Sequence, residues 1–215
     1  MKKFQSYLFD FDGTLVDSMP AYERAMKGIL GDLKVAYGPD LMREITPLGV
    51  LETAHYFVEK LSAPCTEGEI LRQMEKRMSD AYFYHIPAKG HVVSTLRALS
   101  RRGIGLFVLT ASPHLTLDPC LERLGIFDLF SGVFSCDDFH LTKADEALYP
   151  AAAEKMGCSP EKILFFDDQF TPLQCAKKAG LSTCGVFDPS ARDQKDLIRR
   201  NADFYIEDFS QLLDF

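Results

Sequence analysis

The sequence predicts an α/β protein in which a mostly parallel sheet carries an inserted bundle of α-helices. Two observations support this prediction. From Pro87 onward, short apolar runs alternate with amphipathic helical segments, which is typical of a parallel sheet with right-handed crossovers. Before that point, one apolar strand at Tyr7–Phe11 is followed by a stretch, 21–84, with helical periodicity and no convincing strand pattern.

The length and composition are those of a globular protein that can bury a full core. The chain has 215 residues, of which 47% are hydrophobic and 26% charged, and its net charge is -7. No basic stretch stands out, so we expect no nucleic acid and no anionic membrane as partner. We find neither a signal peptide nor an apolar run near the ~20 residues of a membrane helix. The six cysteines are scattered without metal-binding spacing, which favours reduced thiols in a cytoplasmic protein.

The first strand carries two aspartates. Asp10 and Asp12 are spaced i, i+2, so on a strand their side chains share one face, and Gly13 then ends the strand. Both carboxylates are expected at the carboxyl end of the strand, where open α/β sheets place their active sites. Two carboxylates this close repel each other, and a hard cation such as Mg²⁺ between them would offset the repulsion. The alternative is an edge strand that enters an ordinary Asp-Gly turn.

The stretch after the first strand is predicted to contain several helices. Apolar side chains recur at helical spacing from Met26 to Leu33 and again from Leu51 to Leu61. Pro39 precedes a short helix between these two. Thr66 and Glu69 have the spacing of a capping box, with Thr66 as the N-cap, and predict the start of a further helix.

A run of helices between two strands of a sheet indicates an inserted bundle. We therefore expect two domains, a core formed by residues 1–18 and 85–215 and a helical bundle formed by residues 19–84. The alternative is that these helices are an ordinary part of a single domain.

From Pro87 the chain alternates between helices and buried strands. Each strand is a short apolar run that stops at polar or turn residues, and most helices end near a glycine. The predicted strands are Ile104–Leu109, Gly132–Cys136, Ile163–Phe166, Thr183–Phe187 and a minor strand at Asp203–Ile206. The predicted helices include Val92–Leu99, Leu117–Leu124, Leu148–Met156 and Ala176–Ala179.

Polar side chains follow consecutive strands of this predicted sheet. Thr110 follows the second strand, Lys143 lies in the loop and helix start after the third, and the fourth ends at Asp167-Asp168. Because the carboxyl ends of parallel strands share one edge, these groups should converge on the two aspartates of the first strand. Each has an ordinary alternative, namely a helix N-cap, a solvated lysine or a turn. Their arrival in one order at consecutive strand ends favours a shared site.

Residues 10–18, DFDGTLVDS, resemble the first motif of the haloacid dehalogenase superfamily, and most of all its phosphoglycolate-phosphatase and β-phosphoglucomutase branch. The later polar groups match the other motifs of this superfamily in order, so the resemblance covers nearly the whole chain. It implies a Rossmann-like, three-layer parallel-sheet core with an inserted α-helical cap. It also implies a Mg²⁺-dependent enzyme whose partner is a small-molecule phosphate ester, and we expect a monomer or weak dimer.

Three motifs depart from the usual pattern of the superfamily. The residue after Lys143 is alanine rather than proline, and the run Thr110-Ala111-Ser112 lacks the asparagine that many relatives carry. Asp167-Asp168-Gln169 stands where relatives have Glu-Asp-Ser. The resemblance aligns Asp168 with the direct metal ligand and Asp167 with an outer-shell acid, and an alignment shifted by one residue remains open.

The resemblance also implies roles for the acidic residues. Asp10 would be the nucleophile that forms an aspartyl-phosphate, and Asp12 would be the general acid/base. Mg²⁺ would be bound by Asp10, the backbone carbonyl of Asp12 and Asp168, with Asp167 in the outer shell. An acid at position 12 argues against a halide-displacing enzyme, because the dehalogenases of this superfamily lack it.

The phosphate-binding groups implied by the resemblance come from two other motifs. The hydroxyl of Thr110 and the N–H of Ala111 would donate to the phosphoryl oxygens. Lys143 would place a positive charge on the same oxygens. The substrate itself is not identified by these residues.

Two other functions share parts of this pattern. A phosphomutase of the β-phosphoglucomutase type has the same core residues, so only the cap would separate it from a phosphatase. A receiver-type signalling module also has acidic residues, a threonine and a lysine at strand ends, but it is shorter and lacks a helical insert. Substrate contacts from the cap are expected at Met19, Tyr22 and the turn at 46–49, unless these residues only pack the cap.

Overall fold

The computed structural model describes residues 4–46 and 48–215. The chain forms two compact units. The larger unit joins the chain up to Asp17 with Ile86–Phe215, and the smaller unit is Ser18–His85. Because the smaller unit is inserted, two chain connections join it to the larger one.

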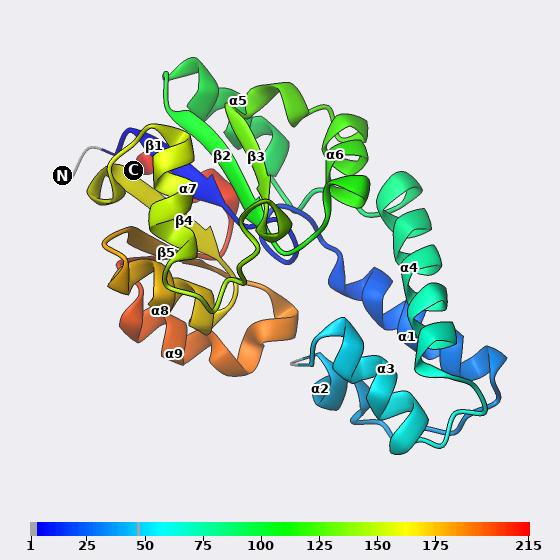
Figure 1. Ribbon diagram of the computed structural model, residues 1–215. Coiled ribbons are helices and arrows are strands. Elements are labelled where there is room, and N and C mark those ends of the chain that lie inside the picture. Colours follow the sequence, from blue (N-terminus) through cyan, green and yellow to red (C-terminus); the bar gives the residue numbers. More distant parts are fainter. Residues whose placement is uncertain (1–3, 47) are drawn as a thin grey trace. The chain divides into compact units, whose positions relative to one another are not determined.

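The larger unit is built on a six-stranded parallel sheet (Figure 1). Its strands are β1 (Ser6–Phe9), β2 (Gly105–Thr110), β3 (Gly132–Ser135), β4 (Ile163–Asp167), β5 (Ser182–Val186) and β6 (Phe204–Ile206). The strand order is β3-β2-β1-β4-β5-β6, so the direction of winding reverses between β1 and β4. In open α/β sheets, ligands bind outside the carboxyl ends of the strands at such a point.

Helices cover both faces of this sheet. One face packs against α7 (Leu148–Met156), α8 (Phe170–Lys178) and α9 (Lys195–Asn201). The other face packs against α5 (Val92–Arg101) and the 3-10 helix η5 (Phe209–Asp214). Leu8 belongs to the first core, whereas the ring of its neighbour Phe9 lies 6.0 Å from that of Phe209, as strand alternation requires. The predicted α/β class with a Rossmann-like three-layer core is confirmed.

The predicted end of the first strand is wrong. The ladder of β1 stops at Phe9, two residues earlier than predicted, and Asp12 makes only an isolated backbone bridge with Val16. Asp10 and Asp12 therefore lie in the loop after the strand, and strand alternation does not decide where their side chains point. The helix α9 was not predicted, because Ile198 is its only buried residue and its sequence has no apolar stripe.

In its described residues, 18–46 and 48–85, the regular structure of the smaller unit is helical. Its helices are α1 (Met19–Asp32), α2 (Leu41–Ile45), α3 (Val50–Glu59) and α4 (Glu67–Tyr84). They share an apolar core that includes Met26, Ile29, Phe57 and Ile70. The predicted capping box is confirmed, since the Thr66 side chain accepts the N–H of Glu69 and a carboxylate oxygen of Glu69 accepts the N–H of Thr66 at 2.8 Å.

Two predictions for the smaller unit need correction. Residues 15–20 were expected to form an irregular turn that leads out of the sheet, but α1 already begins at Met19, and Pro20 lies in its first turn, where a helix tolerates proline. Leu51 was expected on the buried face of α3 but is 65% exposed, and Phe57 is buried instead. Residue Pro47 of the expected turn at 46–49 lies outside the described residues.

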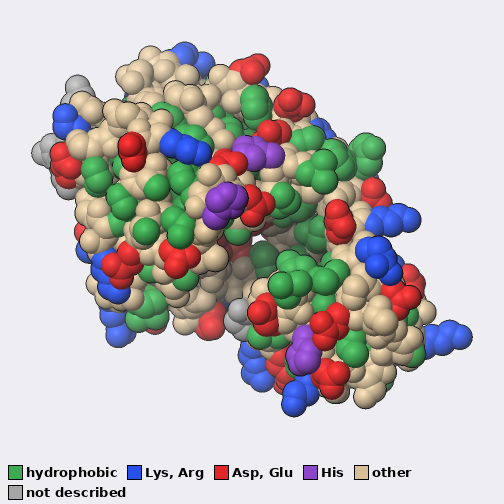
Figure 2. All heavy atoms as spheres, in the orientation of Figure 1, with side chains coloured by type: hydrophobic (Ala, Val, Ile, Leu, Met, Phe, Trp, Pro, Cys, Tyr) green, Lys and Arg blue, Asp and Glu red, His purple; other side chains and the backbone are tan. Residues whose placement is uncertain are grey.

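Acidic and basic side chains are interspersed on the face shown in Figure 2. Among residues 4–46 and 48–215, no helix has the length and apolar character needed to cross a membrane. All six cysteines are free thiols.

Candidate active site

The loop after β1 positions Asp10 and Asp12. The N–H of Asp10 donates to the carbonyl of Phe166 at 2.9 Å, which holds Asp10 against the end of β4. The N–H of Val16 donates to the carbonyl of Phe11 at 3.0 Å, so the loop closes on itself within a few residues. Asp10 is buried and Asp12 is partly exposed.

Gly13 lets this loop pass directly beside β4. Its φ of +76° lies in the left-handed region that favours glycine. A Cβ at this position would lie 2.9 Å from the carboxyl carbon of Asp168. Any other residue would therefore strain the backbone and collide with that carboxyl group.

Three buried carboxylates meet at the switch point between β1 and β4. Asp167 is the last residue of β4, Asp168 follows it, and both lie beside Asp10. One oxygen from each of the three carboxylates lies within 4.8 Å of the other two. Asp168 also accepts a hydrogen bond from the Gln169 side chain at 2.6 Å.

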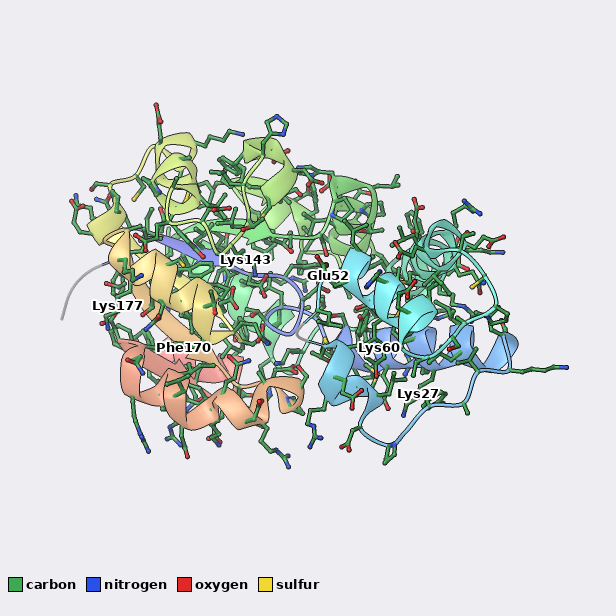
Figure 3. All side chains as sticks on the ribbon, turned by 60° about the horizontal axis from the view of Figure 1, so that its bottom comes forward. Lys27, Glu52, Lys60, Lys143, Phe170 and Lys177 are labelled. Carbon is green, nitrogen blue, oxygen red and sulfur yellow. The ribbon has the colours of Figure 1, made fainter. Side chains whose placement is uncertain are left out.

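Lys143 provides the positive charge of this cluster. It comes from the loop between the 3-10 helix η2 (Cys136–Phe139) and α7, and Figure 3 shows it close to the segment that contains β1. Its Nζ donates to Asp10 and, at 2.8 Å, to Asp167. The Lys143 side chain is only 15% exposed, so water screens these ion pairs weakly.

The charges in the cluster do not balance. Burial raises the pKa of Asp10 to about 7, with Lys143 opposing the rise and Asp167 adding to it. Burial, followed by the charges of Asp167 and Asp10, raises the pKa of Asp168 well above its ordinary value. Burial lowers the pKa of Lys143, but the two carboxylates outweigh it, so the pKa is well above its usual value and the ammonium stays charged. Three buried carboxylates against one ammonium are a donor set that fits a hard divalent cation.

This imbalance predicts how the stability of the metal-free protein depends on pH. The folded pKa of Asp10, about 7, exceeds its ordinary value of 3.8, so the folded state holds this proton more tightly than the unfolded state. The resulting stabilisation is complete below the unfolded pKa and is lost as the pH rises through the folded pKa. In chelator, we expect the free energy of unfolding to fall from pH 5 to pH 8, by at most about 1.4 kcal/mol per pH unit for each proton.

Urea denaturation across this pH range, with and without Mg²⁺, measures the effect. Asp10→Asn is the matched control, because it removes one of the two carboxyl groups with a raised pKa and should make the slope smaller. We also expect Mg²⁺ to stabilise the wild-type protein more at pH 8 than at pH 5. A stability that rises with pH in chelator, or an unchanged slope in the control, would contradict this account.

The loop after β2 brings a second motif to Asp12. Thr110, the last residue of β2, is buried, and its hydroxyl accepts the N–H of Ser112 at 3.1 Å. The Ser112 hydroxyl donates to a carboxylate oxygen of Asp12 at 2.6 Å. Ala111 lies between them and is exposed. The contact from Ser112 to Asp12 was not predicted from the sequence. There, Ser112 was mentioned only as part of a motif that lacks the asparagine of many relatives.

Tyr149 was also missed. It is fully buried on α7, and its hydroxyl donates to the backbone carbonyl of Lys143 at 2.7 Å. The thiol of Cys175 donates to the next carbonyl, that of Ala144, at 3.3 Å. These two contacts restrain the lysine loop at the place where many relatives have a proline. The sequence of α7 is mostly apolar, and no local pattern in it indicated that Tyr149 would bind the backbone of the lysine loop.

The structure thus brings the predicted site residues of the larger unit to one edge of the sheet. The expected contacts from the smaller unit, at Met19, Tyr22 and the turn at 46–49, remain predictions. Within that unit, the Tyr22 hydroxyl lies 3.5 Å from the hydroxyl of Thr53.

Residues 7–186 match the family model of the haloacid dehalogenase-like hydrolases. Since the match covers most of the chain, the protein belongs to this family, as the first motif indicated. Its sequence is also similar to that of phosphoglycolate phosphatases over most of the chain. The phosphoglycolate phosphatase of Escherichia coli (strain K12) is 28% identical over 210 residues, which cover 86% of this chain and 83% of the relative. The chain is accordingly an enzyme of the phosphatase class.

Solved structures show the same fold. A Thermotoga maritima protein named as a "putative beta-phosphoglucomutase" superposes with a TM-score of 0.84 at 23% identity, over 98% of this chain and 97% of that one. A predicted phosphoglycolate phosphatase from Haemophilus somnus 129PT has a TM-score of 0.82 at 24% identity, over 100% and 98% of the two chains. CbbY from Rhodobacter sphaeroides, solved in complex with phosphate, has a TM-score of 0.80 at 22% identity, over 97% and 96%.

Proposed function

We propose that this protein is a Mg²⁺-dependent phosphatase that hydrolyses a small phosphate monoester, phosphoglycolate-like or sugar-phosphate-like, through an aspartyl-phosphate. The observation that carries the proposal is the buried cluster of Asp10, Asp167 and Asp168 with Lys143 at the switch point of the sheet. The names of the phosphoglycolate phosphatase relatives and the phosphate complex of CbbY support it.

The acidic cluster fits a bound Mg²⁺. Asp10, Asp168 and the backbone carbonyl of Asp12 would hold the ion, with Asp167 in the outer shell. When bound, the ion would neutralise the charge that builds up when a carboxylate approaches a phosphate dianion. Two features favour Mg²⁺ at this cluster. Carboxylate oxygens are the hard ligands that Mg²⁺ prefers, and the raised pKa values of Asp10 and Asp168 reflect negative charge that a cation would offset.

Asp10 and Asp12 have different roles in the proposed reaction. A carboxylate oxygen of Asp10 forms a bond to phosphorus, and the bond from phosphorus to the ester oxygen breaks. Asp12, held by Ser112, gives its proton to the departing alcohol. Asp12 then takes a proton from water, which attacks phosphorus and releases Asp10 and inorganic phosphate.

The remaining groups would bind the phosphoryl oxygens. Lys143 donates to Asp10, and its ammonium would contact a phosphoryl group that arrives at that carboxylate. The Thr110 hydroxyl accepts a bond from Ser112 and keeps its own hydrogen for a phosphate oxygen. The exposed Ala111 offers its N–H at the same strand end.

Tyr149→Phe tests whether the lysine loop is held as the structure indicates. The change removes one hydroxyl donor and leaves the Lys143 carbonyl unpaired, so we expect a loss of about 1 kcal/mol in stability. A similar loss in positioning Lys143 would lower kcat/KM about five-fold. Urea denaturation and phosphate release measure the two effects. Tyr205→Phe, on the edge strand β6, is the control, and an unchanged Tyr149→Phe variant would mean that the contact is unimportant.

The proposed function is tested by following phosphate release from purified protein. The panel contains phosphoglycolate, several sugar phosphates and a nucleotide, each with Mg²⁺, with Ca²⁺ and with excess chelator. We expect Mg²⁺-dependent release from at least one ester and inhibition by Ca²⁺, which takes more ligands than Mg²⁺. Full activity in chelator, or no turnover of any ester, would contradict the proposal. Isomerisation of a sugar phosphate without phosphate release would identify the phosphomutase alternative.

Three further properties belong to this proposal. We propose that residues 19–84 act as a cap that selects the substrate, since two chain connections join this helical unit to the core. The free thiols support a cytoplasmic location. A monomer or weak dimer remains our expectation, and light scattering would measure it.

A further inference from the structure

A second partly buried lysine lies outside the carboxylate cluster. Lys89 follows the second connection between the two units, and its side chain is only 16% exposed. Its Nζ donates to the carbonyls of Gly13 and Phe187, both at 2.6 Å, and to a carboxylate oxygen of Asp188 at 2.9 Å. These three partners equal the number of N–H donors on an ammonium group, so the Lys89 charge is fully satisfied.

The backbone around Lys89 is also fixed. Its own N–H donates to the carbonyl of Leu15 at 3.0 Å, and the N–H of Asp17 donates to the carbonyl of Pro87 at 3.0 Å. Val16 and Ala88 form an antiparallel bridge between these two bonds. The base of the connection is therefore tied to the end of the loop that begins at Asp10.

Asp188 is held just as firmly from the other side. It lies beyond the end of β5 and is 2% exposed. The oxygen that does not face Lys89 accepts the N–H of Ser190 at 2.9 Å and its hydroxyl at 2.6 Å. The carboxylate thus has one orientation available, and it presents a fixed partner to the ammonium.

The contact with Gly13 connects this ion pair to the loop that carries Asp10 and Asp12. Gly13 directly follows Asp12, and its Cα faces the Asp168 carboxyl so closely that a Cβ would lie 2.9 Å away. The peptide after Asp12 is therefore confined between Asp168 and the Lys89 ammonium. The neighbouring peptide plane carries the Asp12 carbonyl and is held at one end, where the Gly13 N–H donates to the carbonyl of Val16 at 3.0 Å. The Lys89 ammonium holds the next peptide through the Gly13 carbonyl, so loss of that donor would remove one of the two restraints on Gly13.

We propose that Lys89 is a positioning residue for the metal site. Through the Gly13 carbonyl, it holds the loop after β1 in the conformation that presents the Asp12 carbonyl and the Asp10 carboxylate to Mg²⁺. This inference rests on the proposed function, because it assigns the loop to metal binding. It differs from a purely structural role, in which the ion pair would stabilise the fold without affecting the affinity for Mg²⁺.

Calorimetric titration of the protein with Mg²⁺ alone, without substrate, tests the inference. Lys89→Met by itself would leave the buried Asp188 carboxylate without a counter-charge. It is therefore combined with Asp188→Asn, whose side-chain oxygen can still accept hydrogen bonds from Ser190. We expect the double variant to bind Mg²⁺ about ten-fold or more weakly, the usual cost of removing an outer-shell support. Asp188→Asn alone keeps the bond from Lys89 to Gly13 and should bind Mg²⁺ nearly as tightly as the wild type.

The control and a second readout separate positioning from general damage. Lys178→Met removes a lysine from an exposed ion pair with Glu146 and should leave Mg²⁺ binding unchanged. The double variant should regain phosphatase activity at saturating Mg²⁺, which a damaged fold would not do. If the methionine variant does not fold, Lys89→Ala with Asp188→Asn, which also removes every donor at position 89, replaces it and is judged by the same affinity loss.

Each outcome bears on one of the two proposals. A folded double variant that binds Mg²⁺ within about two-fold of the wild type would overturn the positioning role while leaving the proposed function intact. An equal loss of affinity in Asp188→Asn alone would also overturn it. A wild-type protein that binds no Mg²⁺ would overturn the metal-dependent function and, with it, this inference.

Discussion

Asp10→Asn is expected to lower phosphate release by about four orders of magnitude or more, because an amide oxygen is too weak a nucleophile to form the acyl phosphate. The substitution also removes a carboxylate from the cluster, so it relieves charge repulsion and should not unfold the protein. Asp17→Asn is the matched control, since Asp17 is an exposed acid just beyond the same loop. Steady-state release of phosphate from the best ester of the panel measures both variants.

Identification of the phosphorylated residue completes this test. Acid-quenched wild-type protein, digested and analysed by mass spectrometry, should contain phosphate on the peptide with Asp10, and the Asn variant should contain none. Phosphate on Asp167 or Asp168 would show that the nucleophile is assigned to the wrong strand end. Turnover by Asp10→Asn within about ten-fold of the wild type would rule out covalent catalysis by this residue.

Asp12→Asn is expected to have the second largest effect, about 10²–10⁴-fold on turnover, as is usual for loss of a general acid/base. The nucleophile remains, so Asp10 should still be phosphorylated slowly. Dephosphorylation should slow even more, because water then lacks a base. Rapid-quench experiments should therefore find the phosphoenzyme at a higher level in this variant than in the wild type.

Ser112→Ala is the matched partner of that experiment. It removes the hydroxyl that holds Asp12 but keeps the carboxylate, so the loss of turnover should be about ten-fold or less. A Ser112 variant as slow as Asp12→Asn would mean that the serine itself takes part in the chemistry. A phosphoenzyme level in Asp12→Asn no higher than in the wild type would remove Asp12 from the second step.

Much of the fold could be predicted from local patterns in the sequence. Short apolar runs indicated the buried strands, and the capping box at Thr66 located the start of α4, since both depend on neighbouring residues. Boundaries were less accurate. The aromatic run through Phe11 continues past the point where β1 stops pairing, because pairing depends on how far β2 and β4 extend beside it.

The buried face of α3 shows the same limit. Leu51 and Phe57 are both apolar and both fit a helical stripe, so periodicity alone could not decide which would be buried. The packing of α3 against α4 decides it, and Phe57 joins the core while Leu51 is exposed.

The sequence by itself determined which groups would meet at the edge of the sheet. In a parallel sheet, residues that end neighbouring strands must share an edge, so Asp10, Thr110 and Asp167 could be brought together from their strand positions alone. Lys143 could be added because it follows the next strand in the same order.

Only the tertiary structure decided how these groups are held. The contacts from Ser112 to Asp12, from Tyr149 to Lys143 and from Lys89 to Gly13 join different segments of the chain. Hydroxyl and ammonium groups form hydrogen bonds over only about 3 Å, and such distances depend on the packing of helices and loops rather than on any local pattern. A serine, a tyrosine and a lysine that look ordinary in the sequence acquire their roles through that packing.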